Sequence, residues 1–286
     1  MIANPVKQRL KEGRPPVGMW LAIGDPIVVE RLTARGWDWL GAKQARAMRT
    51  RNGRVRHGST RWAAVLAWLL AGALAVGASG ADTQTGRIVV EDWSKQPVGK
   101  RGIPDGWQGQ NWGSPKYDFT VVSESAVHAL HLRSDNDSST ISKDVKVDIK
   151  QYPILQWRWK VVVLPKGGDA RRKETDDEAA QLYVTFPRFP SALRSRIIGY
   201  IWDSTAPAGA IFPSQKVSTV TFVVVRSGDA DLGNWLTETR NVYEDFKRIY
   251  GEEPKEGVGA VSISINSQNT GSRAEAYFGE IVFRKP

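Results

Sequence analysis

Short runs rich in Val, Ile, Trp, Tyr and Thr recur along the C-terminal two thirds of the chain, with turn residues between them. Runs of this kind are typical of β-strands, because branched and aromatic side chains pack well on a pleated surface. We predict ten strands, at residues 87–92, 117–122, 126–132, 139–148, 153–164, 180–187, 197–203, 217–226, 260–266 and 274–284.

One segment has a helical period instead. Val242, Phe246 and Ile249 share one face of a helix predicted over residues 241–250, and Gly251 provides its C-terminal stop. Ten strands and one short helix predict a mainly β domain over residues 82–286. The expected architecture is an antiparallel β-sandwich, of jelly-roll or galactose-binding-like type, with the N-terminal extension outside the fold.

The segment 48–81 has the three parts of a signal peptide. Residues 48–61 carry five arginines and no acid, Trp62 to Gly77 are apolar, and small residues follow up to Ala81. We predict cleavage after Ala81 and a periplasmic or secreted domain. The alternatives are an uncleaved anchor, with the domain still outside, and a buried core helix.

Residues 1–47 precede this signal. Leu10-Lys11-Glu12-Gly13, Val17-Gly18-Met19-Trp20, Asp25-Pro26 and Gly36-Trp37-Asp38-Trp39 make residues 4–40 resemble the start of the metal-dependent pyruvate aldolases of the 2,4-dihydroxyhept-2-enedioate type. That family is a TIM barrel, and fewer than two of eight β/α units cannot close a barrel. We therefore expect an unfolded remnant without aldolase activity, and translation from Met48.

Charge is distributed unevenly between the extension and the domain. The chain has a net charge of +10, but residues 82–286 contain 27 Lys and Arg against 26 Asp and Glu. Phosphate-backbone binding needs basic side chains on the folded surface, so we expect no nucleic-acid partner. Membrane contact is expected only through residues 48–81. The chain has no cysteine, which excludes disulfides and thiolate metal sites.

Aromatic residues are the first candidates for ligand binding. Trp157 and Trp159 point to the same face of a strand, and Tyr183 and Trp202 lie on strands expected nearby. The favoured interpretation is that these rings fill the core. The alternative is an aromatic platform for a sugar ring. Asn241 and Asn269 are separate ligand-binding candidates, whose polar side chains would line a concave face of a sheet. Asn241 can also cap the helix.

Acidic residues are the second group of candidates. Asp176-Asp177-Glu178 follows Arg171-Arg172-Lys173, which favours a solvated loop with internal charge balance. The alternative is that Asp176 and Asp177 bind calcium, although the favoured expectation is that the domain has no cofactor. A third interpretation is glycoside cleavage by Asp176 or Asp177 together with Glu238. No catalytic residue is assigned.

Three ordered blocks carry a resemblance over residues 88–283. They are Thr175 to Val184, Trp235 to Gly251, and Asn269-Thr270-Gly271 with the following Ala276 to Ile281. In these blocks the chain resembles the domain of unknown function 3047 family (DUF3047). The resemblance implies no activity. We expect a non-catalytic, carbohydrate-binding sandwich of the cell envelope. An envelope glycoside hydrolase or lyase, and a structural partner-binding domain, are the alternatives.

Overall fold

The computed structural model describes residues 18–19, 39–40, 86–124, 127–189 and 194–286, and the chain divides into two units, Met1–Leu74 and Ala75–Pro286. In the first unit β1 (Gly18–Met19) pairs in parallel with β2 (Trp39–Leu40). The predicted signal segment, residues 48–81, lies outside the described residues. In the part that is described, no helix is long and apolar enough to span a membrane.

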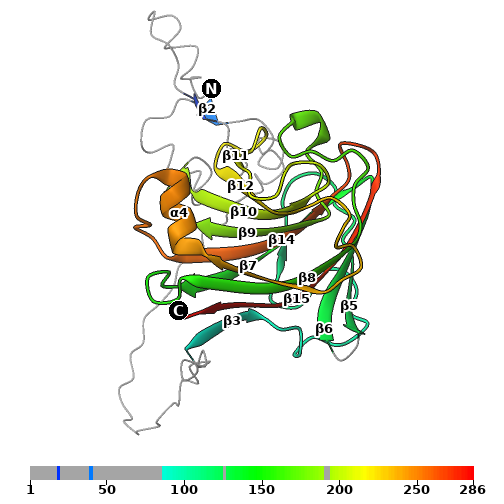
Figure 1. Ribbon diagram of the computed structural model, residues 1–286, viewed down its shortest axis with the longest axis horizontal. Helices are drawn as coiled ribbons and strands as arrows, with labels where there is room; N and C mark the ends of the chain where they lie inside the picture. The colour runs from blue at the N-terminus through cyan, green and yellow to red at the C-terminus, as the bar shows by residue number, and fades with distance from the viewer. Residues whose placement is uncertain (1–17, 20–38, 41–85, 125–126, 190–193) are drawn as a thin grey trace, which may run out of the picture. The chain divides into compact units, whose positions relative to one another are not determined.

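The second unit contains two β-sheets (Figure 1). The seven-stranded sheet has the order β11-β12-β10-β9-β14-β7-β4. Its strands are β4 (Gln108–Gly109), β7 (Ser138–Val147), β9 (Ala180–Phe186), β10 (Arg196–Asp203), β11 (Ile211–Pro213), β12 (Val220–Ser227) and β14 (Val258–Asn266).

The six-stranded sheet has the order β13-β8-β15-β6-β5, and β3 also pairs with β15. Its strands are β3 (Arg87–Glu91), β5 (Asp118–Glu124), β6 (Val127–Asp135), β8 (Ile154–Val163), β13 (Leu236–Asn241) and β15 (Arg273–Arg284). A short 3₁₀ turn, η3 (Lys173–Thr175), precedes β9.

The core lies between the two sheets. Alternate residues of both sheets are fully buried there, such as Leu182 and Ile263 from one and Leu132 and Phe278 from the other. This alternation is the two-residue period of a strand packed on one face. The mainly β sandwich predicted from the sequence is confirmed.

Two features of the sheets differ from the prediction. β10 and β12 are parallel, so the sandwich is not antiparallel throughout. The chain between them crosses over through residues 204–219 and contributes the short edge strand β11, which was not predicted. β4 and β13 were also not predicted. β4 has only two residues, which are too few to show a period. β13 was missed because Thr237-Glu238-Thr239-Arg240-Asn241 is too polar to suggest a strand.

The predicted helix is α4 (Val242–Tyr250), and it follows β13 directly (Figure 1). The Asn241 side chain accepts a hydrogen bond from the Glu244 N–H, which is a standard N-cap. Gly251 ends the helix in the left-handed conformation, with φ of 66°. Val242 and Phe246 are buried in the main core, so the helix closes one end of the sandwich.

Candidate functional site

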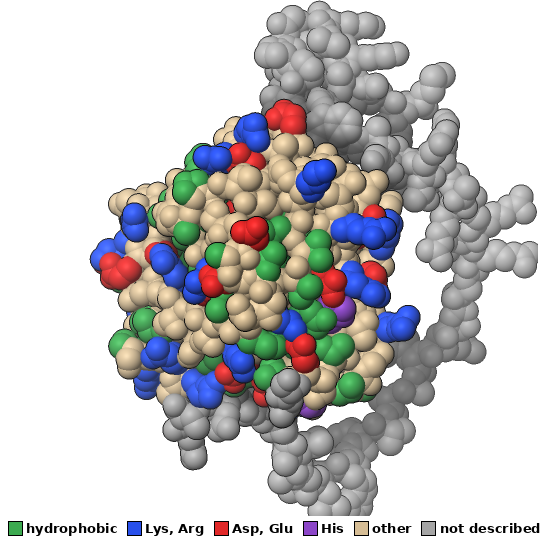
Figure 2. Space-filling view, turned by 45° about the vertical axis from the view of Figure 1, so that its right-hand side comes forward, with side chains coloured by type: hydrophobic (Ala, Val, Ile, Leu, Met, Phe, Trp, Pro, Cys, Tyr) green, Lys and Arg blue, Asp and Glu red, His purple; other side chains and the backbone are tan. Residues whose placement is uncertain are grey.

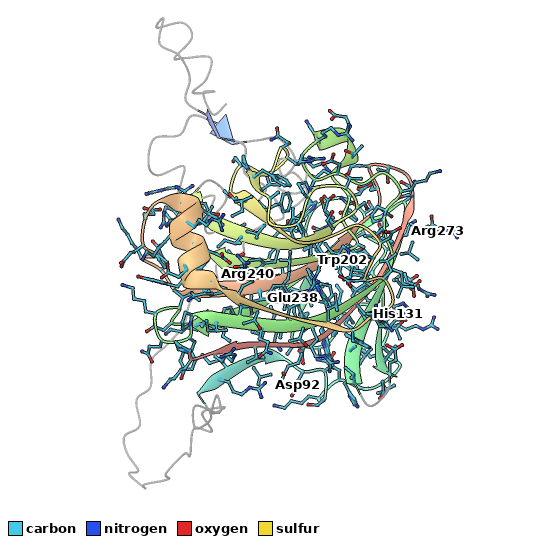
Figure 3. All side chains as sticks on the ribbon, viewed as in Figure 1. Asp92, His131, Trp202, Glu238, Arg240 and Arg273 are labelled. Carbon is cyan, nitrogen blue, oxygen red and sulfur yellow. The ribbon has the colours of Figure 1, made fainter. Side chains whose placement is uncertain are left out.

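The tryptophans that were candidates for a sugar platform lie in the core. Trp157 and Trp159 are completely buried, and Trp202 is 1% exposed. Figure 3 shows Trp202 in the interior, near Glu238. Tyr183 and Trp202 lie on β9 and β10 of the seven-stranded sheet, and not on strands next to β8, which carries Trp157 and Trp159 in the other sheet. Trp202 belongs to the core cluster, and Tyr183 lies on the opposite face of its sheet. These three indoles cannot contact a ligand in the folded domain, which confirms the core interpretation.

The outer face of the seven-stranded sheet, turned away from the core, is polar over three neighbouring strands. The register of β7, β14 and β9 places Ser142, Ser262 and Tyr183 in one row, and Thr140, Ser264 and Gln181 in the next. We call this surface the polar floor; its outward side chains are Ser138, Thr140, Ser142, Ser262, Ser264, Asn266, Gln181, Tyr183 and Thr185. All nine side chains can donate or accept hydrogen bonds, and none carries a charge in its ordinary state.

A pocket of about 270 Å³ opens over this floor. Most of the polar floor lines it, and so do residues from the loops on either side. On the β10 and β12 side the floor gives way to a small apolar cluster that includes Phe222 and Val220. The pocket therefore combines neutral hydrogen-bonding groups with apolar walls, a mixture typical of small-molecule sites.

Trp112 forms one wall of the pocket and is 60% exposed. The Gln110 side chain holds this loop to β7, because its Oε1 accepts a hydrogen bond from Thr140 N–H at 2.8 Å and its Nε2 donates to the Trp112 carbonyl at 3.0 Å. An exposed indole fixed at the mouth of a pocket is available to a ligand. Nothing in the strand pattern marked this residue, since it lies alone in a Gly-rich loop.

Gly199 explains how two aromatic rings reach the floor. It lies on β10 between Tyr183 and Phe222, and a Cβ there would come within 2.9 Å of both rings. The two rings are 6.3 Å apart, centre to centre. The missing side chain therefore lets them lie over β10.

The opposite end of the pocket is acidic. Asp176 and Glu178 both line it and are 6% and 1% exposed. The Lys216 ammonium lies 3.1 Å from Asp176 Oδ2 and also donates to the Asp176 carbonyl and to Asn269 Oδ1. Two carboxyl oxygens, Asp176 Oδ1 and Glu178 Oε1, are buried without a hydrogen-bond partner in the described part of the chain. The solvated loop predicted for this acidic run is therefore wrong.

Asp177 is held by hydrogen bonds from the fold and does not face the pocket. It is completely buried, and it accepts hydrogen bonds from Asn269 N–H (3.0 Å), Thr270 N–H (2.6 Å) and Thr270 Oγ1 (2.8 Å). The carboxylate thus fixes the turn between β14 and β15 to the start of β9. Among the described residues, no group of three or more His, Asp or Glu is arranged to hold a metal ion. The alternative that Asp176 and Asp177 bind calcium stays a prediction.

Of the remaining predicted residues, only Asn269 lies beside the pocket in the described part of the chain. Glu238 does not line the pocket, and its carboxylate accepts hydrogen bonds from Trp159 Nε1 and from Arg226. Asn241 caps α4 and is not a pocket residue. Asn269 lies at the acidic end through its contact with Lys216, and also donates to the Lys173 carbonyl.

Burial raises the pKa of Glu178 well above the ordinary glutamate value, and the charges of Asp176, Asp203 and Asp177 raise it further. The same burial, with the charges of Glu178 and Asp176, raises the pKa of Tyr183. Glu178 therefore holds a proton in the folded domain under conditions in which the unfolded chain releases it.

Because the pKa of Glu178 is higher in the folded domain than in the unfolded chain, the stability of the domain should depend on pH. When only the folded state keeps the proton, the free energy of unfolding falls as pH rises above the ordinary glutamate pKa, by at most about 1.4 kcal/mol per pH unit. We expect Glu178→Gln to lack this loss, so that its stability relative to the wild type increases from about pH 4.5 to pH 7. Urea unfolding across this range measures it, and parallel pH profiles for the two proteins would contradict it.

A family model described as "Protein of unknown function (DUF3047)" matches residues 105–282. The chain belongs to this family. The match covers all the pocket residues and the strands of both sheets except β3 and the last two residues of β15. Two of the three sequence blocks meet in space, because Asp177 of the first block binds Asn269 and Thr270 of the third.

The N-terminal extension has a different relative. A hydroxypyruvate/pyruvate aldolase of Paraburkholderia phytofirmans is 49% identical over 37 residues, which are 13% of this chain. The chain spans only 14% of the length of that protein. The partial aldolase resemblance predicted from the sequence is thereby confirmed.

Solved structures similar to this DUF3047 protein include carbohydrate-binding modules. A family 11 module of a Clostridium thermocellum cellulosomal cellulase is 6% identical, with a TM-score of 0.36 over 70% of this chain and 95% of the module. A family 30 module from the same organism is 11% identical, with a TM-score of 0.37 over 70% and 97%. The xyloglucanase domain of NopAA from Sinorhizobium fredii is 12% identical, with a TM-score of 0.36 over 67% and 96%.

Proposed function

We propose that residues 82–286 form an exported domain that binds carbohydrate in the pocket on the outer face of the seven-stranded sheet. The observation that carries the proposal is the polar floor: uncharged hydroxyl, amide and phenol groups on three adjacent strands, with Trp112 and Phe222 at the sides. Sugars present hydroxyl groups around apolar ring faces, so they match a surface that mixes neutral hydrogen-bonding groups with aromatic rings.

The size of the pocket favours a short piece of glycan. Its volume of about 270 Å³ lies near the lower end of the range for small-molecule sites, roughly 300–1,000 Å³. The pocket is open on one side, next to the exposed Trp112. We infer that one or two sugar rings enter it while the rest of an oligosaccharide stays outside.

Trp112→Ala tests this site. Removing an exposed aromatic wall is expected to lower the affinity for an oligosaccharide found on a glycan array by about tenfold, without changing the fold. Phe189→Ala is the matched control, because Phe189 is also exposed, at 72%, and does not line the pocket. Calorimetric titration of both variants gives the comparison; equal affinities, or a loss only in the control, would contradict the assignment.

Export is the second part of the proposal. It is supported by the order of the basic segment 48–61, the apolar segment 62–77 and the small residues before Asp82. Such a domain would meet polysaccharide outside the cytoplasm. Mass spectrometry of the periplasmic or secreted product should find Asp82 as the first residue, whereas an N-terminus before Met48 would contradict both the cleavage and the proposed start.

A further inference from the structure

Hydrogen-bond acceptors outnumber donors at the acidic end of the pocket. Lys216 is the one described cation that contacts Asp176, and its ammonium uses Asp176 Oδ2, the Asp176 carbonyl and Asn269 Oδ1 at 3.1, 3.2 and 2.7 Å. An ammonium has three N–H donors, so these contacts use all of them. Asp176 Oδ1 and Glu178 Oε1 remain without a donor among the described residues.

The other acids nearby are satisfied within the fold. Asp177 accepts three hydrogen bonds from residues 269–270. Asp203 accepts backbone N–H groups from Ala170, Thr205 and Ala206. The deficit is therefore confined to Asp176 and Glu178, the two carboxyl groups that line the pocket.

We infer that this end of the pocket receives a primary ammonium group, so that the preferred ligand is an unacetylated amino sugar. A buried carboxylate is stable only when it is paired and hydrogen-bonded, and in the free domain Glu178 avoids an unpaired charge by keeping its proton. A ligand ammonium brings the positive charge and the donors that stabilise Asp176 and an ionised Glu178 together. A neutral hydroxyl brings donors but no charge. The inference rests on the proposed function, because the polar floor holds the rest of the sugar.

Lys216 lies beside the place that such a ligand amine takes. Its side chain comes from the loop after β11, where the Ser214 hydroxyl accepts the N–H groups of Lys216 and Val217, and it is 28% exposed. The three oxygens around its ammonium show that this end of the pocket already holds one amine. The ligand amine binds next to it, at Asp176 Oδ1 and Glu178 Oε1, and the flexible Lys216 side chain can shift to make room without a movement of the backbone.

Three oligomers with the same linkage separate the alternatives. Hexamers of β-1,4-linked glucosamine, N-acetylglucosamine and glucose differ only at one ring substituent, which is an ammonium, a neutral amide or a hydroxyl. At about pH 5.5 the amine is charged. We expect the glucosamine hexamer to bind the wild-type domain about 10- to 100-fold more tightly than the other two, because hydrogen bonds between charged groups are the strong ones.

Three variants test which side chains cause the preference for the glucosamine hexamer. Glu178→Gln and Asp176→Asn should each reduce the affinity for the glucosamine hexamer by about 10- to 100-fold and so remove the preference over the glucose hexamer. Lys216→Met removes a positive charge next to the ligand ammonium, so it should keep or tighten glucosamine binding. A loss of tenfold or more in Lys216→Met would overturn the inference, because it would show that the Lys216 ammonium supports binding instead of opposing a second cation. Circular dichroism of each variant checks the fold.

The outcomes also distinguish this inference from the proposed function. If the glucose or N-acetylglucosamine hexamer binds the wild type as tightly as the glucosamine hexamer, or if a glycan array gives only ligands without a free amine, the ammonium assignment is wrong and the carbohydrate site stands. If neither the hexamers nor any glycan on the array binds, both are wrong.

Discussion

Trp159→Ala is expected to lower the free energy of unfolding of the domain by about 3–5 kcal/mol. Trp159 is completely buried, and its ring packs against Trp157, Trp202 and Phe278 with centroids 5.3, 5.9 and 6.0 Å away. Its Nε1 also donates to Glu238, which is 8% exposed, so the truncation removes a hydrogen bond to a buried carboxylate as well as packing. Most domains are stable by only 5–15 kcal/mol, so this is a large fraction of the total.

Urea unfolding followed by far-ultraviolet circular dichroism measures this change. Trp112→Ala is the matched control, because the same residue type is 60% exposed there and its loss is expected to cost about 0.5 kcal/mol or less. The contrast separates a core tryptophan from a pocket tryptophan. Similar small changes in both variants would mean that Trp159 is not in the core.

Asp177→Asn has the second largest expected effect, about 3 kcal/mol or more. The carboxylate accepts three hydrogen bonds from Asn269 and Thr270, and an amide in its place directs N–H groups at N–H donors. Each buried donor left unsatisfied costs about 1–3 kcal/mol. The variant therefore loses the link between the start of β9 and the turn before β15, and with it stability rather than a chemical step.

Thermal unfolding of Asp177→Asn tests this role, with Asp144→Asn as the control on an exposed position of β7. We expect a clearly lower midpoint for the first variant and little change for the second. An Asp177→Asn protein as stable as the wild type would show that the carboxylate is free to do something else, such as holding a metal ion.

Strand positions and core residues could be predicted from the sequence because they depend on local alternation. Residues 154–163, for example, alternate in burial along β8 up to Trp159, as the sequence suggested. The parallel pairing of β10 with β12 could not be predicted from the sequence, because the direction of a strand depends on the path of the chain that connects it to its neighbour. The burial of Asp177 could not be predicted either, since its hydrogen-bond partners lie 92 and 93 residues later in the chain.

The pocket shows the same limit. Tyr183, Asn269 and the acidic run Asp176-Asp177-Glu178 were candidates because of their side-chain chemistry. Trp112 and Lys216 were not, because they lie on two loops that only the fold brings to this pocket. The alternating polar residues of β7, β14 and β9 are visible in the sequence, but whether they face water or a ligand depends on the loops around them.

The surface outside the pocket gives a useful contrast. Figure 2 shows basic and acidic side chains intermixed over one face of the domain, in keeping with their nearly equal numbers in residues 82–286. On the six-stranded sheet, His131 stacks on Tyr277 at 4.1 Å and Trp235 donates to Glu124. Figure 3 shows His131 there. These aromatic groups already contact other residues of the domain, and they form the second candidate surface for glycan binding.

Hydroxyl-radical footprinting with an oligosaccharide found on the array compares the two surfaces most directly. If the pocket is the binding site, the oligosaccharide should reduce the oxidation of Trp112, Tyr183 and Val217, all of which line it, and leave Trp235 and Tyr277 unchanged. Protection of Trp235 and Tyr277 without protection of Trp112 would contradict the assignment of the carbohydrate site to the outer face of the seven-stranded sheet.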